Sequence, residues 1–309
     1  MTFADEREQL LYATLRIRRV EEHIARIYPD DCIQSPVHLS LGQEAVAVGT
    51  CAPLARTDMV FGTYRSHAFY LAKGGSLREM MAELFGKATG CAGGKAGSMH
   101  LTAPEVGFMG SSAVVASTIP NAVGAAFAAR RRRTNAIVVG VFGDGATEEG
   151  VYHESLNFAA LHRLPVLFLC ENNEFAVHSP RRARQSYDIT EHARSFGIAA
   201  KRCGAGFDPE VVRDAVAEAV LALRSGAGPR FIECATYRYA EHVGIGDDHQ
   251  IGYRPLATCN EWRARDPLLN SRACLERFEA PIAAEIEDAV AFAEASPWPT
   301  PDALLRDVA

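Results

Sequence analysis

Two groups of oxygen-bearing side chains follow two short apolar runs near the middle of the sequence. Gly143-Asp144-Gly145 follows the run from Ile137 to Phe142, and Asn172-Asn173 follows the run from Val166 to Cys170. Carboxylate and amide oxygens are ligands that suit Mg²⁺ or Ca²⁺. Backbone N–H groups at the start of a helix favour phosphate. We therefore predict that these two groups together hold a metal-bridged diphosphate.

The residue types allow a specific assignment of this ligand set. The predicted metal ligands are the side chains of Asp144 and Asn173 and the backbone carbonyl of Phe175, which falls in an expected loop. The predicted phosphate ligands are the backbone N–H groups of Gly145 and Ala146, which precede an expected helix near residue 150. The site would thus combine hard oxygen ligands with backbone donors.

The two apolar runs are typical of buried parallel strands, because they are short and rich in β-branched residues. The carboxyl ends of parallel strands meet at one edge of a sheet, where open α/β sheets bind ligands. Further strands are expected over 198–202 and 231–235, with a helix over 209–223 between them. A strand, a helix and a second strand indicate a right-handed parallel crossover. We predict an α/β fold with a doubly wound parallel sheet flanked by helices.

The chain length fits one large domain or two small ones, and we interpret residues 1–309 as a single domain. An apolar stripe at helical spacing predicts a first helix over residues 2–28, within an N-terminal helical arm covering 1–35. The α/β core is expected to cover 36–260. A C-terminal helical extension is expected to cover 261–309.

A dinucleotide-binding turn is a rival interpretation of the same glycines, with Glu171 as the ribose-binding acid. Three observations count against it. Glu148 stands where the third glycine should be, Glu148 and Glu149 add negative charge, and Asp144 would face a pyrophosphate without a cation between them. The simplest alternative, a solvated acidic turn, leaves the Asn172-Asn173 pair unexplained.

Around these residues the chain resembles the alpha subunit of the first component of 2-oxo acid dehydrogenases, such as pyruvate, branched-chain 2-oxo acid and acetoin dehydrogenases. Asn172-Asn173 begins 28 residues after Asp144, which is similar to the spacing of the thiamine diphosphate motif. The whole segment FGDGATEEGVYHESLNFAALHRLPVLFLCENN resembles that family, and the resemblance covers roughly residues 8–270. It implies a thiamine diphosphate-binding fold with thiamine diphosphate and Mg²⁺ as cofactors.

The resemblance also implies cofactor contacts outside the central segment. Tyr64 and Arg65, in the string YRSH, would contact the cofactor, and a guanidinium binds phosphate bidentately. Without the resemblance, Arg65 would be interpreted as an ordinary surface arginine. The backbone at Ala113 and Val115 would support the bent cofactor, although position 113 is usually glycine in the family. His100, in the string GSMH, would be a pocket residue.

Two histidines carry the implied catalytic roles. His38, in HLSLGQEA, would lie near the active centre, and His242, in the frame YRYAEH, would be an active-site histidine that also contacts the cofactor. The four residues His242, Asp247, Asp248 and His249 are interpreted as part of a mobile loop rather than as a metal cluster. The familiar HSMSDP continuation with its regulatory serine is replaced by VGIGDD, so the resemblance does not extend to phosphorylation control.

The expected activity is decarboxylation of a 2-oxo acid, or cleavage of acetoin, with acyl transfer to an acceptor. In the family the carboxylate that activates the cofactor belongs to a beta subunit, so we expect a heterotetramer of two alpha and two beta chains. A lipoyl-bearing acyltransferase would be the acyl acceptor, although the VGIGDD segment weakens that expectation. The alternatives are a thiamine diphosphate-dependent carboligase that forms an acyloin without a lipoyl partner, an NAD-dependent dehydrogenase, and a non-catalytic scaffold.

The composition excludes several other classes of protein. A net charge of −6 does not predict the broad basic surface of a nucleic-acid-binding protein. We interpret Arg130 to Arg133 as a cationic helix terminus. No run of about 18 apolar residues predicts a membrane span. The charged N-terminus is not typical of a signal peptide. The eight cysteines lack the CxxC spacing of a zinc site, and we expect a cytoplasmic protein with free thiols.

Overall fold

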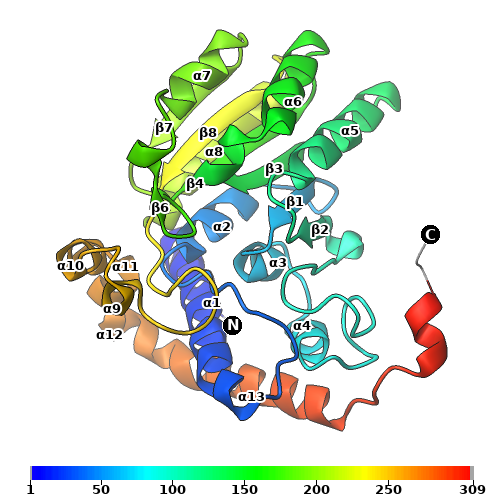
Figure 1. The fold of residues 1–309 in the computed structure, drawn as a ribbon, viewed down its shortest axis with the longest axis vertical. Helices are drawn as coiled ribbons and strands as arrows, with labels where there is room; N and C mark the ends of the chain where they lie inside the picture. The colour runs from blue at the N-terminus through cyan, green and yellow to red at the C-terminus, as the bar shows by residue number, and fades with distance from the viewer. Residues whose placement is uncertain (1, 307–309) are drawn as a thin grey trace.

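A six-stranded parallel sheet forms the centre of the computed structural model, which describes residues 2–306 (Figure 1). The strand order is β2-β1-β3-β4-β8-β7, and every neighbouring pair is parallel. The doubly wound α/β fold predicted from the sequence is therefore confirmed. The strands are β1 (Met59–Thr63), β2 (Phe108–Ser112), β3 (Val138–Gly143), β4 (Val166–Asn172), β7 (Ala199–Cys203) and β8 (Arg230–Ala235).

Alternate residues of the central strands face two separate layers of helices. Val138 and Phe142 of β3 belong to one buried apolar cluster, whereas Val139 and Val141 belong to the other. This period of two is what a strand covered on both faces requires. The first layer contains α5 (Thr118–Arg131), α6 (Gly150–Leu161) and α7 (Ile189–Ser195). The second contains α2 (Glu44–Cys51), α3 (His67–Ala72) and α8 (Pro209–Arg224).

Two long helices, one from each end of the chain, and several shorter helices pack outside the second layer (Figure 1). The first helix begins at Glu6 rather than near residue 2, because the Asp5 side chain accepts a hydrogen bond from the Glu8 N–H and caps it. The outer elements are α1 (Glu6–Ile27), α4 (Leu77–Leu84), α10 (Leu256–Ala264), α11 (Pro267–Asn270), α12 (Arg272–Leu275) and α13 (Glu279–Ala295). Shorter elements include the hairpin β5 (Phe175–Ala176) and β6 (Ser179–Pro180), and α9 (Asp248–Ile251).

A buried ion-pair cluster joins the N-terminal helix, the core and the C-terminal segment. The Arg18 guanidinium donates to Glu44 at the start of α2, with Nη2 to Oε2 at 3.0 Å, and to Asp266 Oδ2, also at 3.0 Å. All three side chains are almost fully shielded from solvent. Removing one partner of such a pair would leave a buried charge uncompensated. Ion pairs as well as apolar packing therefore hold the N-terminal and C-terminal segments against the core.

The glycine-rich segment after α4 is organised by one buried carboxylate. Glu83 accepts four backbone hydrogen bonds at 2.7 to 3.0 Å. The donors are the N–H groups of Ala92, Gly94, Ala96 and Gly97. Gly94 has φ +74°, and a Cβ there would lie 2.6 Å from the Gly86 carbonyl carbon. The glycines thus allow the chain to wrap closely around the Glu83 carboxylate.

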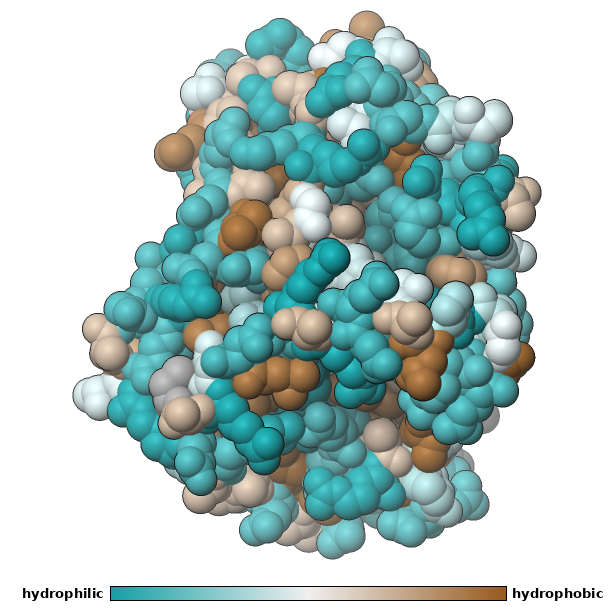
Figure 2. Space-filling view, turned by 90° about the vertical axis from the view of Figure 1, so that its left-hand side faces the viewer, coloured by the Kyte–Doolittle hydropathy of each residue, from teal (hydrophilic) through white to brown (hydrophobic). Residues whose placement is uncertain are grey.

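The outer surface carries mostly polar side chains on the face drawn in Figure 2, where apolar residues form separate groups rather than one patch. Within residues 2–306, no helix combines the length and the apolar character needed to cross a membrane. Cys170 and Cys234 lie in the core strands and are completely buried. In the described part of the chain these cysteines are free thiols.

Candidate active site

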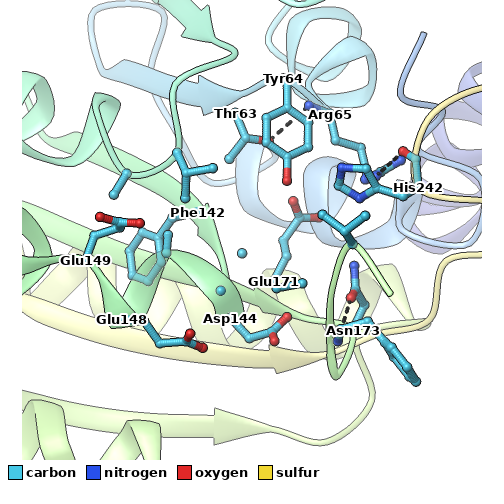
Figure 3. A pocket seen from close by; sticks show the side chains of 18 of the residues that line it. Thr63, Tyr64, Arg65, Phe142, Asp144, Glu148, Glu149, Glu171, Asn173 and His242 are labelled. Carbon is cyan, nitrogen blue, oxygen red and sulfur yellow. Dashed lines mark hydrogen bonds between the residues drawn. The ribbon is translucent and has the colours of Figure 1, made fainter. Parts of the chain in front are cut away.

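A cavity of about 260 Å³ opens at the carboxyl ends of β1, β3 and β4 (Figure 3). Most of the residues predicted to form the site line it. They are Tyr64, Arg65, Val115, Asp144, Gly145, Ala146, Asn173, Phe175 and His242. Ala113 does not line the cavity, although its neighbours Ser112 and Val114 do. His100 is exposed and also lies outside the lining.

The turn after β3 forms the floor of this cavity. It continues as a short 3₁₀ segment over Asp144–Glu148, and α6 begins at Gly150. Gly145 is needed here because of close packing, since an added Cβ would lie 2.8 Å from Cβ of Ala176 in β5. The small side chain lets the hairpin that follows Asn173 approach the turn that carries Asp144.

Asp144 is buried and already has a cationic partner. Its Oδ2 atom accepts a hydrogen bond from Arg184 Nη2 at 2.5 Å, and the same guanidinium also pairs with Glu148. Burial raises the pKa of the Asp144 carboxyl, while the Arg184 guanidinium acts in the opposite direction. The sequence did not predict this partner, because Arg184 lies 40 residues away in an irregular segment with no recognisable spacing.

Asn173 contributes a second oxygen at the same edge. Its Nδ2 donates to Gln43 Oε1 at 3.0 Å, and its Oδ1 accepts from the Phe175 N–H at 3.2 Å. Within residues 2–306, no three His, Cys, Asp or Glu side chains gather as metal ligands. A metal ion here must therefore combine one carboxylate with amide, carbonyl and phosphate oxygens. That is a donor set that Mg²⁺ adopts when it is bound together with a phosphate ligand.

Arg65 is buried rather than on the surface. Its Nη1 donates to the Leu39 carbonyl at 2.7 Å, and its Nη2 donates to the His242 carbonyl at 2.8 Å. Burial, followed by the nearby Arg238, lowers the pKa of Arg65 to about 10, so the guanidinium remains charged at neutral pH. Arg65 therefore places a positive charge at the cavity and also holds the backbone at His242.

Two neutral histidines lie beside that positive charge. The ring centroids of His38 and His242 are 5.2 Å apart, and those of His38 and Tyr64 are 4.6 Å apart. Burial, followed by the Arg65 charge, lowers the pKa of each histidine to about 3. Both imidazoles are thus neutral at pH 7 and can each accept one hydrogen bond.

Unsatisfied polar atoms at the cavity indicate that a polar ligand fits it. His38 Nδ1 and Arg238 Nε are buried and have no hydrogen-bond partner within the described residues. A buried polar atom without a partner costs free energy, about 1–3 kcal/mol. Arg238 lines the cavity, and His38 contacts two rings that line it. A bound group carrying donors and acceptors would remove this cost.

Glu171 is a further site residue, which was considered from the sequence only as the ribose-binding acid of the rival interpretation. It is 5% exposed at the end of β4, and its carboxyl group lies inside the cavity near Tyr64 (Figure 3). Burial raises the pKa of Glu171 to about 7, although Gln43 and Arg65 lower it in part. The site therefore contains a carboxyl group that can hold a proton near neutral pH.

Ion pairs fix the loop that carries His242. Asp248 is buried and accepts from Arg238 Nη2 at 2.7 Å and from Arg254 Nη1 at 3.1 Å. Arg238 Nη1 also approaches His242 Nδ1 at 3.2 Å. Asp248 therefore has defined ion-pair partners within the segment that was interpreted as a mobile loop. The sequence could not reveal this, because the three partners are not arranged at a regular spacing.

Comparisons with known proteins place the chain in a family. A family described as "Dehydrogenase E1 component" matches residues 12–302. The chain is 35% identical over 317 residues to the alpha subunit of acetoin:2,6-dichlorophenolindophenol oxidoreductase from Bacillus subtilis, a match covering 100% of this chain and 95% of that protein. It is 38% identical over 307 residues to the alpha subunit of the pyruvate dehydrogenase E1 component from Rhizobium meliloti, covering 95% and 87%. The corresponding chloroplastic subunit alpha-3 of Arabidopsis thaliana is 38% identical over 309 residues, covering 94% and 71%.

Proposed function

The chain belongs to the dehydrogenase E1 component family of thiamine diphosphate-dependent oxidoreductases, and we propose that it is a magnesium-dependent alpha subunit acting on a 2-oxo acid or on acetoin. One observation carries this proposal. Asp144, Asn173, Arg65 and His242 come from four separate segments and line a single cavity. A non-catalytic scaffold would have no need to keep this arrangement.

The proposed cofactor contacts follow from the residues at the cavity. Asp144, Asn173 and the Phe175 carbonyl would hold Mg²⁺, and the N–H groups of Gly145 and Ala146 would bind the diphosphate. Thiamine diphosphate, when bound, supplies the electron sink for cleavage of the bond next to a 2-oxo group. The buried, charged Arg65 adds positive charge beside these groups.

The chain's own side chains support hydrogen bonding at the reacting end of the cavity. Burial keeps the pKa of both histidines at about 3, so both are neutral. His38 can accept a hydrogen bond from a substrate or cofactor group, whereas His242 Nδ1 accepts from Arg238 and leaves its Nε2–H to donate. Glu171 can exchange a proton near neutral pH, because its pKa is about 7. We assign to these three residues the holding of protons and the orientation of the bound groups.

A beta subunit is the proposed partner, in an assembly of two alpha and two beta chains. The named relatives are alpha subunits, which implies a second type of chain. Val114 and Val115 stand beside the cavity with 67% and 46% of their surfaces exposed, and a partner chain would cover such apolar side chains. The cofactor-activating carboxylate would come from that partner. A cytoplasmic location is part of the proposal.

Acetoin is a second candidate substrate beside a 2-oxo acid. The relative named for acetoin matches the chain along its full length, and the VGIGDD segment departs from the HSMSDP continuation with its regulatory serine. These two features favour an acyloin substrate, or an acyloin-forming carboligase without a lipoyl partner. The acyl acceptor of a 2-oxo acid reaction would be a lipoyl-bearing acyltransferase.

Assays on the assembled enzyme test the proposal. The chain is co-expressed with its beta subunit and supplied with pyruvate, branched-chain 2-oxo acids or acetoin, with dichlorophenolindophenol as electron acceptor. We expect dye reduction with one substrate class, only when thiamine diphosphate and Mg²⁺ are present, and none with the alpha chain alone. Turnover by the alpha chain alone would contradict the proposal that the beta subunit supplies the cofactor-activating carboxylate. Reduction of NAD in the absence of thiamine diphosphate would instead indicate an NAD-dependent dehydrogenase.

A further inference from the structure

A second cavity, of about 340 Å³, lies at the opposite edge of the sheet from the active site. Residues just before β3, β4 and β8 line it, so it faces the amino ends of these strands. Four arginines also line it, and no Asp or Glu of the described chain does. They are Arg130, Arg133, Arg163 and Arg224. We call this site the arginine cavity. It concentrates positive charge in a chain whose net charge is −6.

One of the four guanidinium groups is neutralised within the chain. Arg224 donates to Asp58 Oδ2 at 2.6 Å and to the Asn135 carbonyl at 2.7 Å. Asp58 is completely buried, and it also accepts from the N–H groups of Ala55 and Ile137. Arg224 is therefore a structural residue that connects α8 to the start of β1 and β3.

The other three arginines keep donors without a protein acceptor. Arg130 Nη1 donates hydrogen bonds to the carbonyls of His162 and Arg163. Arg163 Nη2 donates to the Gly226 carbonyl at 3.2 Å. The remaining nitrogens of Arg130 and Arg163 have no acceptor within residues 2–306, and neither does the whole guanidinium of Arg133. Two carbonyl contacts thus orient Arg130 and one orients Arg163, and their other N–H groups are available to a ligand.

Helix dipoles account for only part of this charge. Helices α5, α6 and α8 all end beside the arginine cavity, and a helix C-terminus carries roughly half a negative charge. Three such termini and the Asp58 carboxylate together fall short of the four guanidinium charges. The arginine cavity therefore retains a net positive charge, which an anion from solution would balance.

We propose that the arginine cavity binds a small molecule carrying at least two phosphate groups. The planar guanidinium fork binds phosphate oxygens in pairs, which makes arginine suited to this ligand class. The three available arginines come from two separate helix ends and surround a volume larger than one phosphate group needs. Thr134 and Asn135 line the same cavity and provide neutral donors. None of these residues lines the active site, so the proposal stands independently of the proposed function.

Inorganic pyrophosphate is the ligand for the test, measured by calorimetry on the assembly of alpha and beta chains. The assembly is first loaded with thiamine diphosphate and Mg²⁺ and then freed of excess metal and cofactor by dialysis. We expect saturable binding, with one pyrophosphate per alpha chain and no release of bound thiamine diphosphate. The double variant Arg133→Gln/Arg163→Gln should weaken this binding at least tenfold.

A matched variant removes the same charge from the same region. Arg131 and Arg132 belong to the same run as Arg133 but do not line the arginine cavity. The double variant Arg131→Gln/Arg132→Gln should therefore change pyrophosphate affinity by less than about threefold, the size expected of screened surface charge. Three outcomes would overturn the proposal: no saturable binding, equal weakening by both double variants, or release of thiamine diphosphate by pyrophosphate. Thermal unfolding of each variant checks that a loss of binding does not come from misfolding.

Discussion

Asp144 has to share its carboxylate between the Arg184 guanidinium and the metal ion that it is proposed to bind. Arg184 occupies Oδ2 at 2.5 Å, and its side chain is only 12% exposed. We predict that Arg184→Gln strengthens Mg²⁺ binding by about fivefold, roughly 1 kcal/mol, because the competing cation is gone. The measurement is Mg²⁺ titration of the assembly in the presence of saturating thiamine diphosphate.

Arg182 provides the control for this substitution. It lies in the same segment, is exposed, and makes no contact with Asp144. Arg182→Gln removes the same charge from the segment, so it should leave Mg²⁺ affinity nearly unchanged. Weaker Mg²⁺ binding by Arg184→Gln would mean that Arg184 orders the metal site instead of competing for it.

Glu171 makes stability depend on pH in a defined direction. Burial raises its pKa to about 7, so its stabilising contribution is complete below the unfolded-state pKa of 4.5 and is lost as pH rises through 7. Glu171→Gln keeps a neutral side chain at every pH. We predict that this substitution stabilises the chain by roughly 3 kcal/mol at pH 8.5 and has little effect at pH 4 to 5. Urea unfolding at the two pH values measures this difference, and an equal effect at both would exclude the assigned shift.

Among the elements, the glycine-rich segment depends on α4 through Glu83. Glu83→Ala would leave four backbone N–H groups without their acceptor, and each buried unsatisfied group costs about 1–3 kcal/mol. We predict a loss of more than about 3 kcal/mol in the free energy of unfolding, measured with guanidinium chloride. Glu79→Ala, on the exposed side of the same helix, should cost less than about 1 kcal/mol. Similar losses for the two variants would contradict the organising role of Glu83.

The sequence predicted some elements well and others not at all. Strands β3, β4, β7 and β8 begin and end within two residues of the expected runs. Three of them, β3, β4 and β8, are short apolar segments inside the sheet, whereas β7 is an edge strand. Strand β2 was missed, since Phe108–Ser112 contains a glycine and two serines in a stretch that looks irregular. Its order comes from parallel pairing with β1, which is a long-range interaction that local patterns do not contain.

For the molecule as a whole, the site residues that were predicted belong to local sequence patterns, whereas those that were missed depend on long-range packing. Asp144, Asn173 and Tyr64 were found because they follow strands or stand in motifs, and all three line the cavity. Arg184 and the buried state of Glu171 depend on packing between distant segments, so no spacing in the sequence indicated them. The site is also open beside Val114 and Val115, consistent with the proposal that a second subunit completes it.

The central claim is that this chain supplies the metal and diphosphate half of a thiamine diphosphate site. The most direct measurement is calorimetric titration of thiamine diphosphate into the assembly, with and without Mg²⁺, for the wild type and for Asp144→Ala. We predict binding by the wild type only when Mg²⁺ is present, and at least a hundredfold loss of affinity in Asp144→Ala, because the only carboxylate assigned to the metal is removed. Undiminished binding by Asp144→Ala, or wild-type binding that does not need Mg²⁺, would contradict the account.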